Sequence, residues 1–104
     1  MTKYGNKKTI VGDFTFDSAK EAKRWGELML LQRAGQISDL RRQIPYPLVV
    51  NGKTVCKLVV DFDYRENGQL IVEDTKSEFT RKLPVWRLKS KLFTAIHGFS
   101  VREV

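Results

Sequence analysis

Two Asn-Gly dipeptides constrain the fold of this 104-residue chain more than any other feature. Asn51-Gly52 and Asn67-Gly68 each lie between runs in which apolar and polar residues alternate. Both central residues of a tight hairpin turn take positive φ angles, and Asn and Gly accept that conformation most readily. We therefore predict an antiparallel meander of three strands. Its strands cover residues 37–50, 54–65 and 69–77.

A helix is predicted before the meander. Asp17 or Ser18 can cap its first turn, and Ser18 with Glu21 matches the capping-box pattern. The helix runs to about Ala34, and Gly35 supplies the left-handed residue that ends it. Glu21 falls in the middle of the apolar stripe of this helix, where an unpaired carboxylate is unfavourable. The sequence leaves open whether Glu21 only completes the cap or belongs to a buried site.

A hairpin, a second helix and a final strand complete the predicted elements. Residues 8–16 form the hairpin around Gly12-Asp13, the second helix begins between Thr80 and Pro84 and ends near His97-Gly98, and residues 99–104 form the strand. Pro45 and Pro47 place the first meander strand at an edge or a bend, because proline donates no ladder hydrogen bond. The order is a hairpin followed by α-β-β-β-α-β, which indicates an α+β or mixed α/β domain.

Length and composition fit one small domain over residues 1–104, with residues 1–7 flexible. The hydrophobic content of 41% supports a single core. No apolar run approaches the roughly 20 residues of a membrane span. The single cysteine, Cys56, excludes an internal disulfide and a cysteine-based zinc cluster, so we expect a soluble protein of the reducing cytoplasm.

The distribution of charge indicates a polyanionic partner. The chain carries a formal charge of +7, yet residues 61–80 hold six acidic residues against two basic ones. The flanking segments are basic, with 11 basic residues against five acidic ones in residues 1–60 and six against one in residues 81–104. A surface built only for solubility would mix the two signs more evenly. We therefore expect an acidic site within a protein that binds phosphates.

The acidic segment places carboxylates where a cation could lie between them. Alternate residues of a strand share a face, so Leu70, Val72, Asp74 and Lys76 line one side of the third meander strand. Counting back through the turn at Glu66-Asn67-Gly68 brings the region from Asp61 to Asp63 close to Asp74. Two facing carboxylates repel each other unless a cation lies between them. An all-oxygen ligand set favours Mg²⁺ or Mn²⁺.

These residues predict hydrolysis of a phosphodiester bond. Asp61, Asp74 and the Thr75 carbonyl would hold one or two cations, which lower the pKa of a bound water and offset charge on the phosphorus. Lys76 would position the water or stabilise the transition state. Glu21 could hold the outer shell of the metal or a second metal. Basic residues around the second helix are predicted to bind DNA phosphates, and these are Arg81, Lys82, Arg87, Lys89 and Lys91.

The remaining notable side chains are interpreted structurally. The other acids of the segment form a solvated face in this interpretation, and these are Asp63, Glu66, Glu73 and Glu78. Trp25 and Trp86 are interpreted as core or interface residues rather than as platforms for stacked bases.

The helix acid and the two strand motifs together resemble the PD-(D/E)XK nuclease superfamily. Glu21, "VVDFDY" around Asp61 and "VEDTKS" around Asp74 and Lys76 carry this resemblance. More narrowly, "FDSAKEAKRWGELMLLQRAGQISDLRRQIPYPL" and "RLKSKLF" resemble a family of small phage and prophage endonucleases related to Holliday-junction resolvases. The resemblance covers residues 7–104.

The resemblance implies a restriction-endonuclease-like core with a mixed central sheet between helices. It implies catalytic roles for Glu21, Asp61, Asp74 and Lys76, and a homodimer that presents two sites to a DNA junction. We expect a Mg²⁺-dependent DNA endonuclease, with Mn²⁺ as a substitute and no small-molecule cofactor, that acts on branched DNA in phage recombination or packaging. Because the chain has no room for a base-reading module, it would recognise shape and backbone. The alternative is a catalytically silent nucleic-acid-binding or replisome-interaction module with the same fold.

Overall fold

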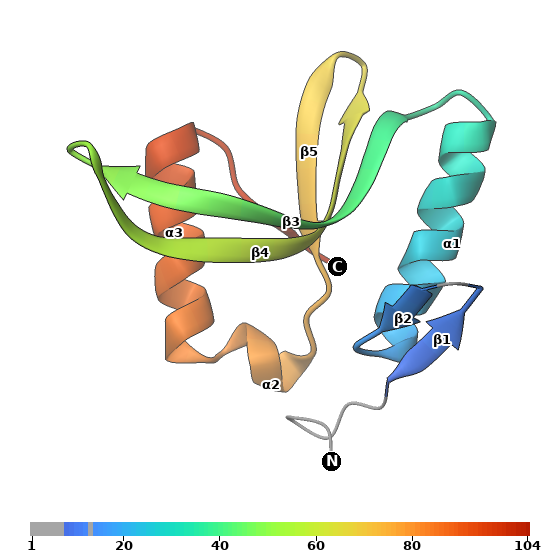
Figure 1. Ribbon diagram of the computed structural model, residues 1–104, viewed down its shortest axis with the longest axis horizontal. Coiled ribbons are helices and arrows are strands. Elements are labelled where there is room, and N and C mark those ends of the chain that lie inside the picture. The colour runs from blue at the N-terminus through green and yellow to red at the C-terminus, as the bar shows by residue number, and fades with distance from the viewer. Residues whose placement is uncertain (1–7, 13) are drawn as a thin grey trace.

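The computed structural model describes residues 8–12 and 14–104. Two predictions fall on residues outside these ranges. They are the flexibility of residues 1–7 and the place of Asp13 in the first turn. Figure 1 shows a twisted sheet between two long helices, with a small hairpin beside the first helix. Within the described ranges, no helix is long and apolar enough to span a bilayer. The elements are β1 (Thr9–Val11), β2 (Phe14–Phe16), α1 (Ala19–Arg33), β3 (Ser38–Val50), β4 (Lys53–Glu66), β5 (Gln69–Asp74), α2 (Glu78–Arg81), α3 (Pro84–His97) and β6 (Arg102–Glu103).

The main sheet is mixed and has the strand order β3-β4-β5-β6. The first three strands are antiparallel, and β6 runs parallel to β5. Both Asn-Gly turns form where they were predicted, with φ angles of 52° and 79° at Asn51 and Gly52 and of 54° and 77° at Asn67 and Gly68. Two consecutive positive φ angles are typical of the type I′ turn, whose twist matches that of the strands. β3 is an edge strand, which confirms the position inferred from its two prolines.

The two long helices cover opposite faces of β5. Leu28 of α1 packs in one hydrophobic cluster with Ile71, and Phe93 of α3 packs in the other cluster with Val72. Successive strand residues point to opposite faces, so these two clusters lie on the two sides of the strand. Burial is therefore continuous from residue 71 to residue 74 instead of alternating. The two tryptophans pack in these clusters, as predicted, and they are Trp25 and Trp86.

The ends of α1 also follow the prediction. The Ser18 hydroxyl accepts a hydrogen bond from the Glu21 N–H at 3.1 Å. Ala34 forms the C-terminal cap, and Gly35 follows with a φ of 79°. The sequence therefore fixes where this helix begins, and hence where Glu21 lies in its first turn.

The chain leaves the sheet earlier than predicted. β5 ends at Asp74 rather than at Ser77, which instead caps the short helix α2. The Ser77 hydroxyl accepts from the Thr80 N–H at 3.1 Å, and the Thr80 hydroxyl accepts from the Ser77 N–H at 2.8 Å. This reciprocal cap offers the backbone an alternative to the strand ladder. α3 then begins at Pro84 and ends before Gly98, whose φ is 81°, as predicted.

Asp63 is buried, which contradicts its interpretation as part of a solvated face. Its side chain is 1% exposed. Its carboxylate accepts two hydrogen bonds from the Arg41 guanidinium, at 2.9 and 2.5 Å, and one from the Tyr46 hydroxyl at 2.6 Å. A buried carboxylate is tolerated when its oxygens are paired in this way. Asp63 therefore joins β3 to β4 rather than facing solvent.

Glu73 is also buried, on the opposite face of the sheet, and its interpretation as a solvated acid was wrong as well. Arg24 of α1 donates to both of its carboxylate oxygens, at 2.8 and 2.6 Å. The Tyr64 hydroxyl donates to the same carboxylate. Burial and this hydrogen bond raise the pKa of Tyr64 to about 12. The pair fixes the position of α1 on the sheet, next to the acids described below.

Candidate active site

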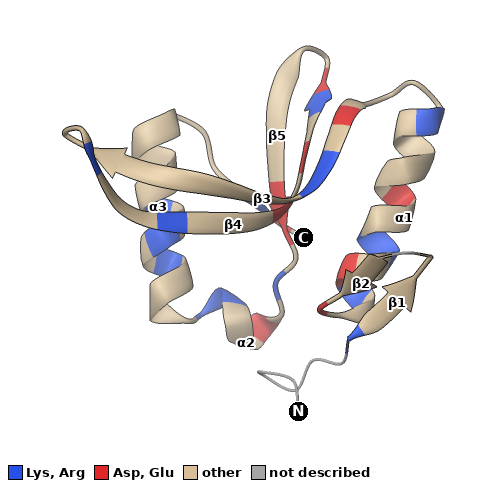
Figure 2. Cartoon of the chain, in the orientation of Figure 1, with Lys and Arg blue, Asp and Glu red and all other residues tan. Residues whose placement is uncertain are grey.

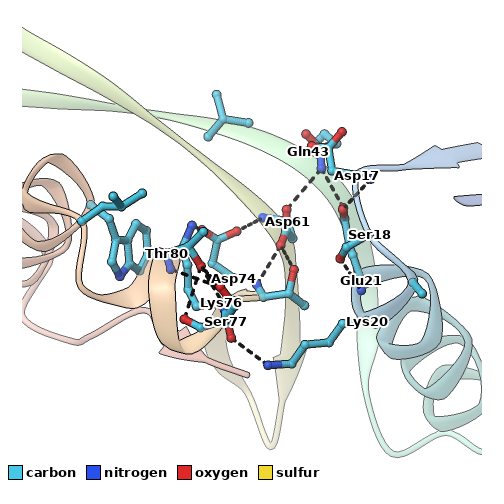
Figure 3. A pocket seen from close by; sticks show the side chains of 15 residues that line it. Asp17, Ser18, Lys20, Glu21, Gln43, Asp61, Asp74, Lys76, Ser77 and Thr80 are labelled. Atoms are coloured by element: carbon cyan, nitrogen blue, oxygen red, sulfur yellow. Dashed lines mark hydrogen bonds and ion pairs between the residues drawn. The ribbon is translucent and has the colours of Figure 1, made fainter. Parts of the chain in front are cut away.

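A cleft of about 640 Å³ lies where the start of α1, the sheet and the segment around α2 meet. Figure 3 shows side chains of α1 on one side of this cleft facing those of β4 and of the segment after β5 on the other. The lining includes every residue that the sequence predicted to be catalytic or to hold a metal. These residues are Glu21, Asp61, Asp74, Thr75 and Lys76.

Asp61 and Asp74 meet across the β4–β5 ladder. The register pairs Phe62 with Glu73, and continuing it by one residue places the two aspartates opposite each other. The Asp61 N–H donates to Asp74 Oδ1 at 3.0 Å. The N–H and the hydroxyl of Thr75 donate to Asp61 Oδ2 at 2.7 and 2.5 Å. These bonds fix the orientation of both carboxylates before any ligand binds.

Glu21 takes part in both of the roles that the sequence left open. Its Oε1 accepts from the Asp17 N–H at 3.1 Å, so the carboxylate helps to cap α1. Its Oε2 accepts from the amide of Gln43 at 2.9 Å, on the side of the cleft. The side chain is 1% exposed. Glu21 is thus a buried acid held at the edge of the aspartate pair.

Gln43 is a site residue that sequence reasoning missed. Its amide nitrogen lies 2.9 Å from Glu21 Oε2 and 3.4 Å from Asp61 Oδ1, between two acids from different elements. Its backbone has a φ of 54°, an uncommon value for a residue other than glycine, just after a register irregularity in β3. Such conformations persist where the surrounding structure enforces them, often at functional sites. A glutamine within a strand gives no sequence signal that would have identified it.

The cleft is acidic although the protein is basic. Its described lining contains four carboxylates and two lysines, against a charge of +7 for the whole chain. Burial, and next the charge of Asp61, raises the pKa of Asp74 to about 8. The same two causes, in the same order, raise the pKa of Glu21 to about 7. The crowded negative charge is therefore unfavourable at neutral pH, and a bound cation would relieve it.

Lys76 lies against Asp74 and the indole of Trp86. Its Nζ is 2.9 Å from Asp74 Oδ2 and 4.1 Å from the centre of a Trp86 ring. The indole N–H donates to Glu103 at 3.0 Å, which orients the ring. Lys20 of α1 reaches across and donates to the Lys76 carbonyl at 2.7 Å. The Lys76 ammonium is thereby held in the cleft by an ion pair and a cation–π contact.

The donor atoms suit Mg²⁺ or Mn²⁺. No histidine or cysteine is among the described residues that line the cleft. The described part of the chain also has no group of three or more His, Cys, Asp or Glu side chains that could hold a metal ion. Mg²⁺ often binds one or two carboxylates and completes its shell with water and phosphate oxygens. Asp61 and Asp74, with Thr75 beside them, fit that incomplete kind of site.

None of the five basic residues predicted to bind DNA is among the described residues that line the cleft. Arg81 pairs with Glu103 at 3.0 Å, and Lys82 lies 3.7 Å from Glu78. Lys89 donates to a backbone carbonyl of β4 at 3.0 Å. The remaining two, Arg87 and Lys91, are exposed on α3. Figure 2 shows lysines and arginines along α3, apart from the acidic centre of the sheet.

Comparison with family models places the chain in one family. Residues 1–102 match the model of the family described as "Protein of unknown function (DUF1064)", and the chain belongs to that family. Comparisons with curated proteins and with solved structures gave no significant match.

Proposed function

We propose that this member of the DUF1064 family is a metal-dependent DNA endonuclease with a PD-(D/E)XK core. The observation that carries the proposal is the convergence of Glu21, Asp61, Asp74 and Lys76, from three separate parts of the chain, in one cleft. Nothing in the packing of a small domain requires three buried or half-buried carboxylates and an ammonium to meet there. A negative cleft in a protein of charge +7 fits a phosphate substrate that arrives with a divalent cation.

The roles of the residues follow from their positions. Asp61, Asp74 and the Thr75 carbonyl would hold Mg²⁺ or Mn²⁺, which when bound supplies a Lewis acid and a more acidic water. The Lys76 ammonium, fixed by Asp74 and Trp86, can donate to a phosphate oxygen on which charge develops. Glu21 can accept a proton from water at the edge of the site, because its pKa is raised to about 7.

The substrate in this proposal is branched DNA. Recognition by this domain would rest on the shape and the backbone of the DNA, because phosphate contacts fix register and orientation but carry no sequence information directly. Action on a four-way junction requires two cuts in opposing strands, and a homodimer would supply the two sites. The protein would act in the host cytoplasm during phage recombination or packaging.

A cleavage assay tests the proposal. Purified protein is incubated with a labelled four-way junction and a matched linear duplex, in Mg²⁺ and in EDTA, beside Asp74→Asn. The control is Asp39→Asn, which changes an exposed aspartate at a φ of 56° that asparagine also accepts. Paired nicks in the junction alone, lost in EDTA and in Asp74→Asn but kept in Asp39→Asn, are expected. Equal cleavage of both DNAs would remove the selectivity for branches, and binding without cleavage would indicate a silent binding module.

A further inference from the structure

We infer that a second hollow beside the cleft binds the phosphate that neighbours the one to be cleaved. This inference rests on the proposed function and names the path of the substrate strand. The hollow has a volume of about 320 Å³. It shares two lining residues with the cleft, Lys20 and Thr75, so the two sites meet along that boundary. Its other lining residues are Lys23, Arg24, Glu27 and Val104.

The hollow is basic where the cleft is acidic. Three cationic side chains and one acidic side chain line it, whereas four acidic side chains and two lysines line the described cleft. The three cations are at positions 20, 23 and 24 of α1, a spacing that places them on one face of the helix. A phosphate in the cleft therefore needs a metal ion, but a phosphate in the hollow would meet cationic side chains directly.

The two lysines have donors free for a ligand. Arg24 is already occupied, because it donates to Glu73 and lies 3.3 Å from Glu27. An ammonium group has three N–H donors, and Lys20 uses one of them for its hydrogen bond to the Lys76 carbonyl. Lys23 is exposed and has no hydrogen bond or ion pair with any residue that the structure describes. Glu27, the one acidic side chain in the described lining, is thus paired with Arg24, and the positive charges of Lys20 and Lys23 remain.

Adjacent phosphates of one strand match this arrangement. Successive phosphates of one strand advance by about 3.4 Å along a helix axis. The cleft and the hollow share Lys20 and Thr75, so neighbouring phosphates of one strand can occupy both. In and just after α2, on the opposite side of the cleft, Arg81 and Lys82 do not line the cleft as described and are already paired with Glu103 and Glu78. The strand therefore leaves the cleft over the first half of α1, and the ligand of the hollow is a phosphodiester group of the same DNA.

The test measures DNA binding without cleavage. Affinity of the full chain for a labelled junction is measured by fluorescence anisotropy at several salt concentrations, with Ca²⁺ replacing Mg²⁺. Lys23→Ala should weaken binding about fivefold and reduce the slope of log affinity against log salt by about 1, because one phosphate contact is lost. The control Arg33→Ala removes an exposed charge from the last turn of the same helix and should leave both values unchanged.

Three outcomes would overturn the inference. In the first, Lys23→Ala behaves like the control Arg33→Ala. In the second, the salt slope falls in Arg87→Ala and Lys91→Ala but not in Lys23→Ala. In the third, the unaltered chain does not bind DNA. Cleavage kinetics in Mg²⁺ add a second measurement, in which Lys23→Ala should raise KM and leave kcat unchanged. Binding that depends on Lys23 without any cleavage would reject the nuclease and keep the phosphate site, so the two proposals can fail separately.

Discussion

Asp74 should make the metal-free protein less stable at neutral pH than at acidic pH. Its pKa is raised from an ordinary value of 3.8 to about 8, chiefly by burial and then by the charge of Asp61, while Lys76 opposes the shift. Such an acid favours folding fully below its unfolded pKa, and this contribution is lost as the pH rises through the folded pKa. Each pH unit inside that window removes about 1.36 kcal/mol, so Asp74 alone should lower the free energy of unfolding by about 3 kcal/mol from pH 5 to pH 7.

Urea denaturation in EDTA measures this effect. The transition is followed by tryptophan fluorescence at pH 5, 6 and 7, for the unaltered chain and for Asp74→Asn. Asparagine carries no charge at these pH values, so the variant should lose at least half of the pH dependence. Asp39→Asn, at an exposed position, should keep all of it. An equal pH dependence in the unaltered chain and in Asp74→Asn, or a stability that rises from pH 5 to pH 7, would refute the reasoning.

Three further predictions follow from the same structure. Mg²⁺ should raise the melting temperature more at pH 8 than at pH 5, because protons compete with the metal for the buried carboxylates of the cleft. Differential scanning fluorimetry measures both shifts, and equal shifts at the two pH values would contradict the prediction. Gln43→Gly should change the free energy of unfolding by less than about 1 kcal/mol, because glycine accepts a φ of 54° more easily but the buried Glu21 carboxylate loses a donor. The same variant should lower the single-turnover cleavage rate, because two carboxylates lose a shared donor, and a loss of stability with no loss of rate would be the contrary result. Glu73→Gln should lower the free energy of unfolding by about 3 kcal/mol, because it leaves the half-buried Arg24 without its carboxylate. The control Glu66→Gln, at a more exposed position, should change the free energy of unfolding by less than about 0.5 kcal/mol. Equal losses for the two variants in urea denaturation would contradict a stabilising Arg24–Glu73 pair.

The meander and the aspartate pair could be predicted because their signals are local. Asn67-Gly68 fixes the turn between β4 and β5, and a tight turn fixes the register of the two strands. Once the register is known, counting places Asp61 opposite Asp74 without any knowledge of the rest of the fold. The cap at Ser18 similarly fixes where Glu21 lies on α1.

The features that could not be predicted depend on distant partners. Asp63 and Glu73 have the same local pattern as surface acids, and they are buried because Arg41 and Arg24 reach them from other elements. The role of Gln43 depends on an irregularity of the β3–β4 register, which shifts the side chains of β3 relative to the site. Periodicity describes one strand at a time, so it contains no information on either kind of contact.

Paramagnetic mapping with Mn²⁺ tests most directly whether the cleft binds a divalent cation. Substoichiometric Mn²⁺ is added to ¹⁵N-labelled protein, and the broadening of each amide signal is recorded, with Mg²⁺ added afterwards as a competitor. We expect the signals of Asp61, Thr75 and Lys76 to broaden first and to recover with Mg²⁺, and Asp74→Asn to weaken the effect. Signals that broaden first at the exposed Asp39 or Glu78, or an unchanged response in Asp74→Asn, would contradict the metal site and the nuclease mechanism built on it.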